Sequence, residues 1–183
     1  MMIKKNTTHP KFLSRKFLKD NRGSLDKFTD KTILKELKFK IVESQISKYY
    51  KNVFRGIYMQ LGKYGEAKFI KLLNGKIIWF TIDLRKKSKT FGKLYAFKLT
   101  TEKILYTPRG FAHGSFAEKD SEALILADNS YNNKYSIGIN YKDQNYYKKL
   151  KKYFKNKKII ISKWHNSYKS FEKAKKKIFH ENF

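Results

Sequence analysis

Three separated stretches of the chain combine arginine, tyrosine and histidine, side chains suited to holding phosphate groups and moving protons. They are Arg55-Gly56-Ile57-Tyr58-Met59-Gln60, Ile82-Asp83-Leu84-Arg85 and Thr107-Pro108-Arg109-Gly110-Phe111-Ala112-His113-Gly114. A planar guanidinium can bind a diphosphate through two parallel hydrogen bonds. Nearly all of the 43 basic residues are lysines, so the placement of arginines inside these stretches is informative.

Length and composition limit the classes of protein to which the chain can belong. Its 183 residues are enough for one domain with its own core and too few for two ordinary ones. We therefore expect a single domain over residues 1–183. There is no cysteine, which excludes disulfides and thiolate metal sites. No signal-peptide pattern or membrane-spanning apolar run is present, and this predicts a cytoplasmic protein with no membrane partner.

The formal net charge of +28 is the strongest compositional feature. Taken alone, it favours an anionic partner: nucleic acid, a membrane surface or a phosphorylated small molecule. The lysines are spread along the whole chain, however, whereas nucleic-acid recognition is usually marked by arginine clusters or a known motif. We interpret them as a solvated surface and do not expect a nucleic-acid-binding protein.

The middle of the chain has the pattern of β-strands. Lys68–Leu73 is followed by the turn dipeptide Asn74-Gly75 and then by Lys76–Leu84, which is rich in β-branched and aromatic residues. This order predicts a hairpin of two antiparallel strands. Further short strands are predicted at Gly92–Leu99, Lys103–Tyr106, Gly114–Ala117 and Ala123–Ala127. Many short strands at this spacing predict a sandwich or a barrel.

Helical patterns occur only towards the two ends of the chain. They cover Lys31–Leu37, Gln144–Phe154 and Ser170–Phe179. In the second segment Leu150 and Phe154 fall on one face, with lysines over the rest, as in an amphipathic helix. The pattern therefore predicts an all-β domain flanked by short helices.

With this order of elements, the three stretches resemble the dTDP-4-keto-6-deoxyglucose (dTDP-4-dehydrorhamnose) 3,5-epimerase family, dimeric cupins of rhamnose biosynthesis. The resemblance runs from about Asp20 to Phe171 and includes Asn21-Arg22-Gly23, Ser88-Lys89-Thr90-Phe91-Gly92-Lys93 and Ile161-Ser162-Lys163. It implies a cupin jelly-roll barrel with short helices at the C-terminus. It also implies an isomerase without metal or cofactor, and a homodimer.

The family chemistry is enolisation of a 4-keto sugar linked to a nucleoside diphosphate. The carbonyl acidifies the hydrogens at C3 and C5, so inversion needs a base, a proton donor on the opposite face and a cation for the enolate oxygen. The resemblance implies that Lys68 is that cation and Tyr131 the opposite-face acid. It places Arg22 and Arg55 on the diphosphate and His113 in the sugar pocket.

Three polar residues complete the substrate-binding set that the resemblance implies. Gln60 ends the first stretch, and Ser47 lies eight residues before Arg55 on a strand that is polar in the family. Glu43 stands where a glutamine is usual. This difference predicts a sugar or base around the pocket other than the usual one.

The catalytic base departs from the family pattern. The pattern Arg-Gly-Leu/Ile-His ends here in Tyr58, and the partner aspartate, expected three residues after Ser162, is His165. Free tyrosine has a pKa near 10 against about 6.5 for histidine. Tyr58 alone would therefore be almost wholly protonated at neutral pH.

Three outcomes stay open for the altered site. Tyr58 and His165 form an exchanged pair, or Tyr131 or His113 takes over for a single centre, or the site binds without turnover. We interpret the chain as a nucleotide-sugar epimerase acting on a 4-keto hexose or heptose at C3, C5 or both, with one centre favoured. The alternatives are a 3,4-ketoisomerase, which uses the same enolate, and a noncatalytic sugar-nucleotide binding homologue.

Overall fold

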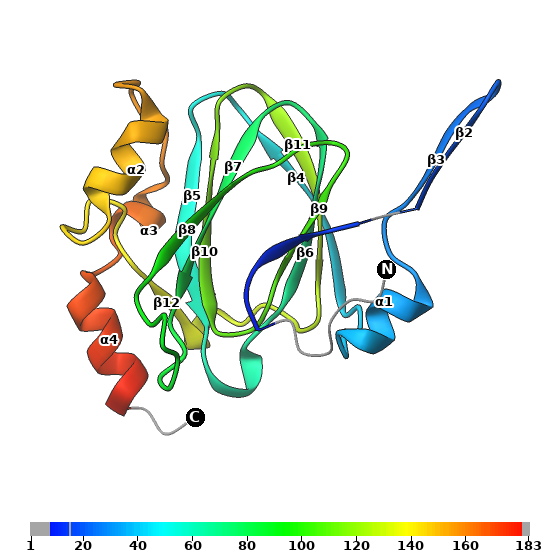
Figure 1. The fold of residues 1–183 in the computed structure, drawn as a ribbon. Coiled ribbons are helices and arrows are strands. Elements are labelled where there is room, and N and C mark those ends of the chain that lie inside the picture. The colour runs from blue at the N-terminus through cyan, green and yellow to red at the C-terminus, as the bar shows by residue number, and fades with distance from the viewer. Residues whose placement is uncertain (1–7, 15, 181–183) are drawn as a thin grey trace.

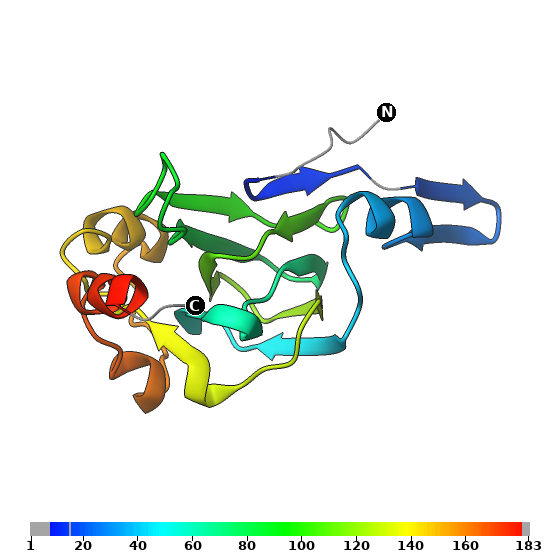
Figure 2. The same cartoon turned by 90° about the horizontal axis from the view of Figure 1, so that it is seen from below.

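Two antiparallel five-stranded sheets face each other and form a jelly-roll barrel (Figure 1). The computed structural model describes residues 8–14 and 16–180. The strand order is β1-β9-β6-β11-β4 in the first sheet and β12-β5-β10-β7-β8 in the second. A separate hairpin, β2-β3, and the C-terminal helices lie at opposite ends of the barrel (Figure 2).

The elements have the following bounds. The strands of the first sheet are β1 (Lys11–Leu13), β4 (Glu43–Tyr49), β6 (Lys68–Asn74), β9 (Ile104–Thr107) and β11 (Ser121–Ala127). Those of the second are β5 (Phe54–Gln60), β7 (Ile77–Asp83), β8 (Leu94–Lys98), β10 (Phe111–Ala117) and β12 (Ser136–Gly138). The hairpin consists of β2 (Lys16–Asp20) and β3 (Gly23–Lys27). The helices are α1 (Lys31–Glu36), α2 (Tyr147–Phe154), α3 (Lys163–Asn166) and α4 (Phe171–His180), with 3-10 turns η1 (Gly62–Tyr64) and η2 (Asn133–Tyr135). None of the helices in the described ranges is long and apolar enough to cross a membrane.

Three apolar clusters bury both faces of each sheet. On the outside of the second sheet, α2 and α4 insert side chains such as Leu150 and Ile178. On the outside of the first sheet, α1 contributes Ile33, and Asp30 caps this helix by accepting a hydrogen bond from its backbone. Between the sheets lies a third cluster that includes Ile70 and Ile77. Strands buried on both faces read as continuous apolar runs in the sequence.

The predicted fold class is confirmed: the structure is an all-β barrel with short helices at the C-terminus. The predicted strands correspond to β6 to β11, and β10 begins at Phe111, three residues before the predicted start. The three predicted helices correspond to α1, α2 and α4. That the chain is a single domain remains a prediction.

The predicted hairpin around Asn74-Gly75 is wrong, although both of its strands exist. β6 pairs with β9 and β11, whereas β7 pairs with β8 and β10 in the other sheet. The turn carries the chain from one sheet to the other, with Gly75 at φ +86° and the Lys76 amide donating to Ser121 Oγ at 2.8 Å. An Asn-Gly dipeptide can form the turn of a hairpin or a turn that joins two sheets. Here β6 and β7 each have two other strand partners, so they do not pair with each other.

A bulge in β5 sets which side chains face the barrel interior. His113 lies opposite Tyr58 and Ser115 lies opposite Arg55, so that two residue steps on β10 match three on β5. Gly56 makes this possible at φ +97°, because a Cβ there would lie 2.5 Å from the carbonyl oxygen of His113. Residues three apart on a regular strand face opposite sides. Here Arg55 and Tyr58 share the inner side.

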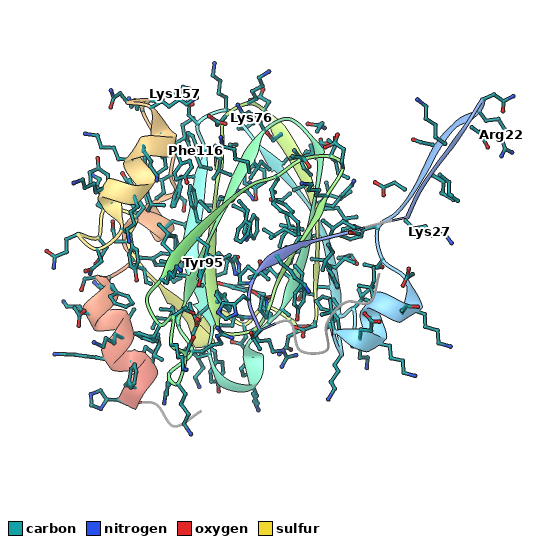
Figure 3. The ribbon with its side chains drawn as sticks, viewed as in Figure 1. Arg22, Lys27, Lys76, Tyr95, Phe116 and Lys157 are labelled. Carbon is teal, nitrogen blue, oxygen red and sulfur yellow. The ribbon has the colours of Figure 1, made fainter. Side chains whose placement is uncertain are left out.

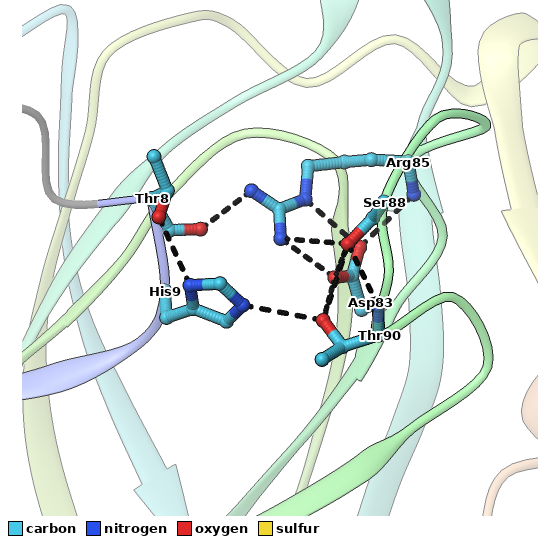
Figure 4. Close-up of polar contacts among 6 residues, drawn as sticks. All are labelled: Thr8, His9, Asp83, Arg85, Ser88 and Thr90. Atoms are coloured by element: carbon cyan, nitrogen blue, oxygen red, sulfur yellow. Dashed lines mark hydrogen bonds and ion pairs between the residues drawn. The ribbon is translucent and has the colours of Figure 1, made fainter.

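A buried carboxylate at the end of β7 ties the N-terminal segment to the barrel (Figure 4). Asp83 is 0% exposed and accepts from Arg85 Nε at 2.9 Å and Nη2 at 2.6 Å. The hydroxyls of Ser88 and Thr90 each donate to it at 2.6 Å, and Arg85 and Thr90 in turn contact residues 8–9. Burial by itself raises the pKa of Asp83, but these hydrogen bonds outweigh it and hold the pKa below its usual range.

Replacing Asp83 with asparagine should lower the free energy of unfolding by about 3 kcal/mol at pH 7, because the Arg85 guanidinium loses its counter-charge. The folded-state pKa lies below the unfolded value of about 3.9, so this stabilisation is present above about pH 4 and is lost as the pH falls further. Urea unfolding at pH 7 and pH 3 measures the difference. A deficit of equal size at both pH values would contradict the assignment. The exposed Glu172, replaced by glutamine, is the control and should change stability by less than about 0.5 kcal/mol.

Candidate active site

A cavity of about 170 Å³ lies inside the barrel, and both sheets contribute to its wall. Most of the predicted site residues line it, from β4, β5, β6, β10 and α3. The lining residues are Gln45, Ser47, Tyr49, Arg55, Tyr58, Lys68, Trp79, His113, Gly114, Ser115, Ile125 and His165. The structure therefore brings together groups that are far apart in the sequence.

Aromatic rings stack across the cavity around Tyr58. The centroid of its ring lies 4.7 Å from that of His113 and 6.0 Å from that of His165, to which it is nearly parallel at 13°. On the other side of His113, Trp79 stacks at 5.6 Å and 14°; sequence reasoning did not identify this tryptophan. No hydrogen bond joins Tyr58 to His165 among the described residues, so their exchanged pair remains a prediction.

The surroundings of these rings keep them uncharged at neutral pH. Burial, and after it the charge of Glu66, raises the pKa of Tyr58 above its usual range. Burial, and after it the charge of Lys68, lowers the pKa of His113 well below its usual range. Burial is also the largest cause that lowers the pKa of His165. The site thus offers a phenol that donates a proton and two neutral imidazoles that can accept one.

Lys68 reaches the cavity from the start of β6 and is paired with Glu66. Its Nζ lies 3.0 Å from Glu66 Oε1, and the two side chains are only 7% and 3% exposed. Sequence reasoning identified the lysine but not the carboxylate. The available signal was an acidic residue two positions before a lysine at the start of an apolar strand, a spacing that places both side chains on the same side.

The guanidinium of Arg55 is fixed at the cavity mouth by β4. It donates to Ser47 Oγ at 2.7 Å and to the Lys48 carbonyl at 2.7 Å. It also lies over the ring of Tyr49, 4.4 Å from the centroid. Ser47 therefore orients the arginine, and the exposed side of the guanidinium remains open to an anion.

Gln60 and Glu43 hold the loop that carries Tyr131 instead of lining the cavity. Gln60 Nε2 donates to the Ser130 carbonyl at 3.1 Å, and its Oε1 accepts from the Asn132 amide. Glu43 Oε1 accepts from the Tyr131 amide at 3.0 Å. The structure therefore gives both residues a part in positioning Tyr131, where the sequence indicated direct substrate binding.

Tyr131 lies at the rim of the site. Its side chain is 46% exposed, its ring stands edge-on to Tyr58 at 6.3 Å and 84°, and its hydroxyl donates to Asn133 Oδ1 at 3.1 Å. Tyr168, which the sequence did not indicate, lies against His165, with ring centroids 5.4 Å apart and ring planes tilted by 57°. The phenol predicted as the opposite-face acid is thus beside the cavity and not part of its wall.

Arg22 is a predicted site residue that lies away from both the cavity and its rim. It lies at the tip of the β2-β3 hairpin, where Figure 3 shows it pointing away from the barrel. Its Nη2 pairs with Asp20 at 2.7 Å, and its side chain is 85% exposed. A role in substrate binding within a second copy remains a prediction.

The assembled groups are suited to proton transfer beside a stabilised oxyanion. Lys68 supplies a cation, the phenols supply proton donors and the neutral imidazoles supply acceptors. Within the described ranges, no group of three or more histidine, aspartate or glutamate side chains is placed to hold a metal ion.

Comparison with known proteins identifies relatives along most of the chain. The family model for dTDP-4-dehydrorhamnose 3,5-epimerase matches residues 8–173. The dTDP-4-dehydrorhamnose 3,5-epimerase of Salmonella typhimurium LT2 is 33% identical over 139 residues, which are 72% of this chain and 76% of the relative. The predicted isomerase class, a nucleotide-sugar epimerase, is confirmed by these relatives.

Solved structures share the fold at lower identity. The dTDP-4-dehydrorhamnose 3,5-epimerase of Bacillus anthracis Ames, with TDP and PPi bound, is 24% identical and superimposes with a TM-score of 0.80 over 93% of this chain and 99% of that one. ChmJ, a 3′-monoepimerase from Streptomyces bikiniensis in complex with dTDP-quinovose, is 15% identical, with a TM-score of 0.80 over 92% and 86%. On the match of the family model and the Salmonella relative, this chain belongs to the dTDP-4-dehydrorhamnose 3,5-epimerase family.

Proposed function

We propose that the protein inverts one carbon centre of a nucleotide-linked 4-keto hexose or heptose by enolisation. The observation that carries this proposal is the single cavity in which Lys68, Tyr58, His113 and His165 meet, with Arg55 at its mouth. These groups supply the cation, the proton donors and acceptors, and the diphosphate anchor that such a reaction needs.

The proposed reaction has two proton transfers. A neutral imidazole, His165 in the first instance, takes the proton from the carbon next to the carbonyl. The electrons of the broken C–H bond move to the carbonyl oxygen, and the ammonium of Lys68 stabilises the resulting enolate. Tyr131 then donates its phenolic proton to the same carbon from the opposite face, because Tyr58 stacks on His165 and so lies on the side of the base. The tyrosinate recovers a proton from solvent or from the imidazolium.

Inversion of one centre is favoured over two because the usual base is replaced. A tyrosine whose pKa is raised by burial and by the charge of Glu66 is a weak base at neutral pH. With one strong proton acceptor fewer, the site can deprotonate the sugar at fewer carbon positions. ChmJ, which shares the fold, is named as a 3′-monoepimerase, so inversion at one centre is compatible with this architecture.

The substrate is proposed to be a nucleoside diphosphate sugar, with dTDP as the first nucleotide to test. The names of the relatives specify dTDP sugars, and the Bacillus anthracis structure contains TDP and PPi. The exposed guanidinium of Arg55 at the cavity mouth is suited to a diphosphate.

We further propose a homodimer in the cytoplasm. The hairpin carries the cross-strand pair Leu18 and Leu25, each of them 57% exposed. A two-stranded hairpin is marginally stable without a surface to pack on, and a second copy of the barrel would supply one. Arg22 would then approach the partner's cavity.

Arg55→Ala and Lys68→Ala should have separable effects. The first removes a contact to the diphosphate in the ground state and should weaken dTDP-sugar binding on the order of 10- to 100-fold. The second removes a charge that matters when the enolate forms and should lower kcat on the order of 100-fold or more. Titration calorimetry and steady-state kinetics measure the two quantities. Equal losses of binding in both variants, without a separate loss of turnover, would remove the enolate role from Lys68.

The wild-type protein should incorporate solvent deuterium at C3 or C5 of a dTDP-linked 4-keto sugar, and Tyr58→Phe should abolish this at one carbon. Removing the hydroxyl removes a transferable proton and leaves the ring in place. Proton NMR in heavy water follows each position separately. Unchanged exchange in Tyr58→Phe would leave Tyr58 a pocket-shaping residue and move proton transfer to Tyr131 and His113. Absence of exchange in the wild type would indicate a noncatalytic binding protein.

Light scattering should give about twice the chain mass of 21.9 kDa. Arg22→Ala should then weaken dTDP binding and leave the dimer intact, because the arginine is at the hairpin tip and not in its apolar pair. A monomer that binds nucleotide as tightly as the wild type would contradict both the dimer and the role of Arg22.

A further inference from the structure

Glu66 lies beside the cavity, where its carboxylate pairs with Lys68 and its charge also acts on Tyr58. Glu66 is absent from the lining of the cavity, whereas Lys68 is part of it. The ion pair between them, 3.0 Å from Nζ to Oε1, is nearly closed to solvent. Among the described residues, Lys68 makes no other ion pair or side-chain hydrogen bond. One carboxylate therefore holds the ammonium of a residue that lines the cavity.

The other carboxylates near this position are engaged elsewhere. Asp128 accepts from Arg109 Nε at 3.0 Å and from a backbone amide. Glu43 accepts from the Tyr131 amide and from a glutamine side chain. Their charges act on Glu66 only at longer range. Glu66 is thus the carboxylate assigned to the cavity lysine.

Burial makes the two charges depend on each other. Desolvation raises the pKa of Glu66, and the charge of Lys68 and its hydrogen bond act in the opposite direction. An ammonium in the same interior also needs a counter-charge, since a lone buried charge is strongly unfavourable. The pair therefore holds the Lys68 side chain in place before a substrate arrives.

The position of Glu66 also leaves the lysine free to act. A carboxylate inside the cavity would compete with the substrate oxygen for the ammonium and would repel a growing negative charge. Because Lys68 lines the cavity and Glu66 does not, the ammonium can donate to the carboxylate and still offer another hydrogen to the enolate oxygen. A lysine held in this way needs no rearrangement when the enolate forms, which is where preorganised charges contribute most.

We propose that Glu66 is a positioning residue of this enzyme, acting through Lys68 on the formation of the enolate. The proposal rests on the enolisation reaction proposed above. It assigns a function to a side chain that touches neither the substrate nor the cavity, and it predicts an effect on turnover with little effect on binding.

The test is a set of variants assayed by the rate of deuterium incorporation into a dTDP-linked 4-keto sugar. Glu66→Gln keeps the shape and removes the charge, and should lower kcat on the order of 10- to 100-fold, with KM and dTDP affinity within about threefold of the wild type. Lys68→Met should lower kcat further. The double variant should be no slower than Lys68→Met, because Glu66 has nothing left to position. Glu66→Asp, which keeps the charge on a shorter side chain, should be faster than Glu66→Gln and remains available if the glutamine variant does not fold.

Glu118→Gln is the matched control. Glu118 is also a buried carboxylate with lysine partners, Lys76 at 3.2 Å and Lys155 at 3.4 Å, and it does not line the cavity. It should lose thermal stability and retain kcat. The proposal is overturned if Glu66→Gln turns over at the wild-type rate, or if the two single effects multiply in the double variant. If the wild-type protein exchanges no deuterium, the proposed reaction itself is refuted. The Glu66 proposal is judged separately, by comparing the variants with an active wild-type protein.

Discussion

The close approach of β5 to β10 at Gly56 is the constraint on which the site depends. With φ at +97° and no side chain, Gly56 brings its backbone against the carbonyl of His113, where a Cβ would lie 2.5 Å away. The bulge this creates places Arg55 and Tyr58 on the same side of the strand and sets Tyr58 beside His113. On a regular strand, one of the two would point into the core beneath the C-terminal helices. Anchor and proton donor therefore share a cavity because one residue lacks a side chain.

Burial of the cavity strengthens the electrostatic interactions of each charge in it and raises the free-energy cost of holding that charge away from water. Away from water, the Lys68 ammonium would act on the proposed enolate with little screening. The same environment requires a partner for that ammonium, which Glu66 supplies at 3.0 Å. It also makes the neutral forms of Tyr58 and His113 the favoured ones. Apart from Arg55 at its mouth, the site therefore combines a fixed charge pair with aromatic groups that are neutral at rest and can exchange protons.

Local patterns predicted β6 to β11 and three helices, but not β1 to β5, β12 or α3. Apolar periodicity located the strands from β6 to β11 and three helices, because each buries a defined face. The partners of β6 and β7 lie up to 59 residues away in the sequence, so an Asn-Gly turn alone could not assign them. Resemblance located Lys68 and Arg55, yet the hydrogen bonds of Gln60 to the Tyr131 loop arise only after folding. Arg22 lies outside the site of a single chain, since its proposed partner is not in the same chain.

The support of Arg55 by β4 has a consequence for how such a protein diverges. Its guanidinium is oriented by Ser47, by a backbone carbonyl and by the face of Tyr49, and by none of the groups that exchange protons. Substitutions at Tyr58 or His165 therefore leave the contacts that orient Arg55, the proposed diphosphate anchor, intact. During evolution, one or two amino-acid substitutions can therefore change the stereochemical outcome, while each variant along the way still recognises the nucleotide sugar. Inherited recognition and variable chemistry then evolve at separate rates within one small barrel.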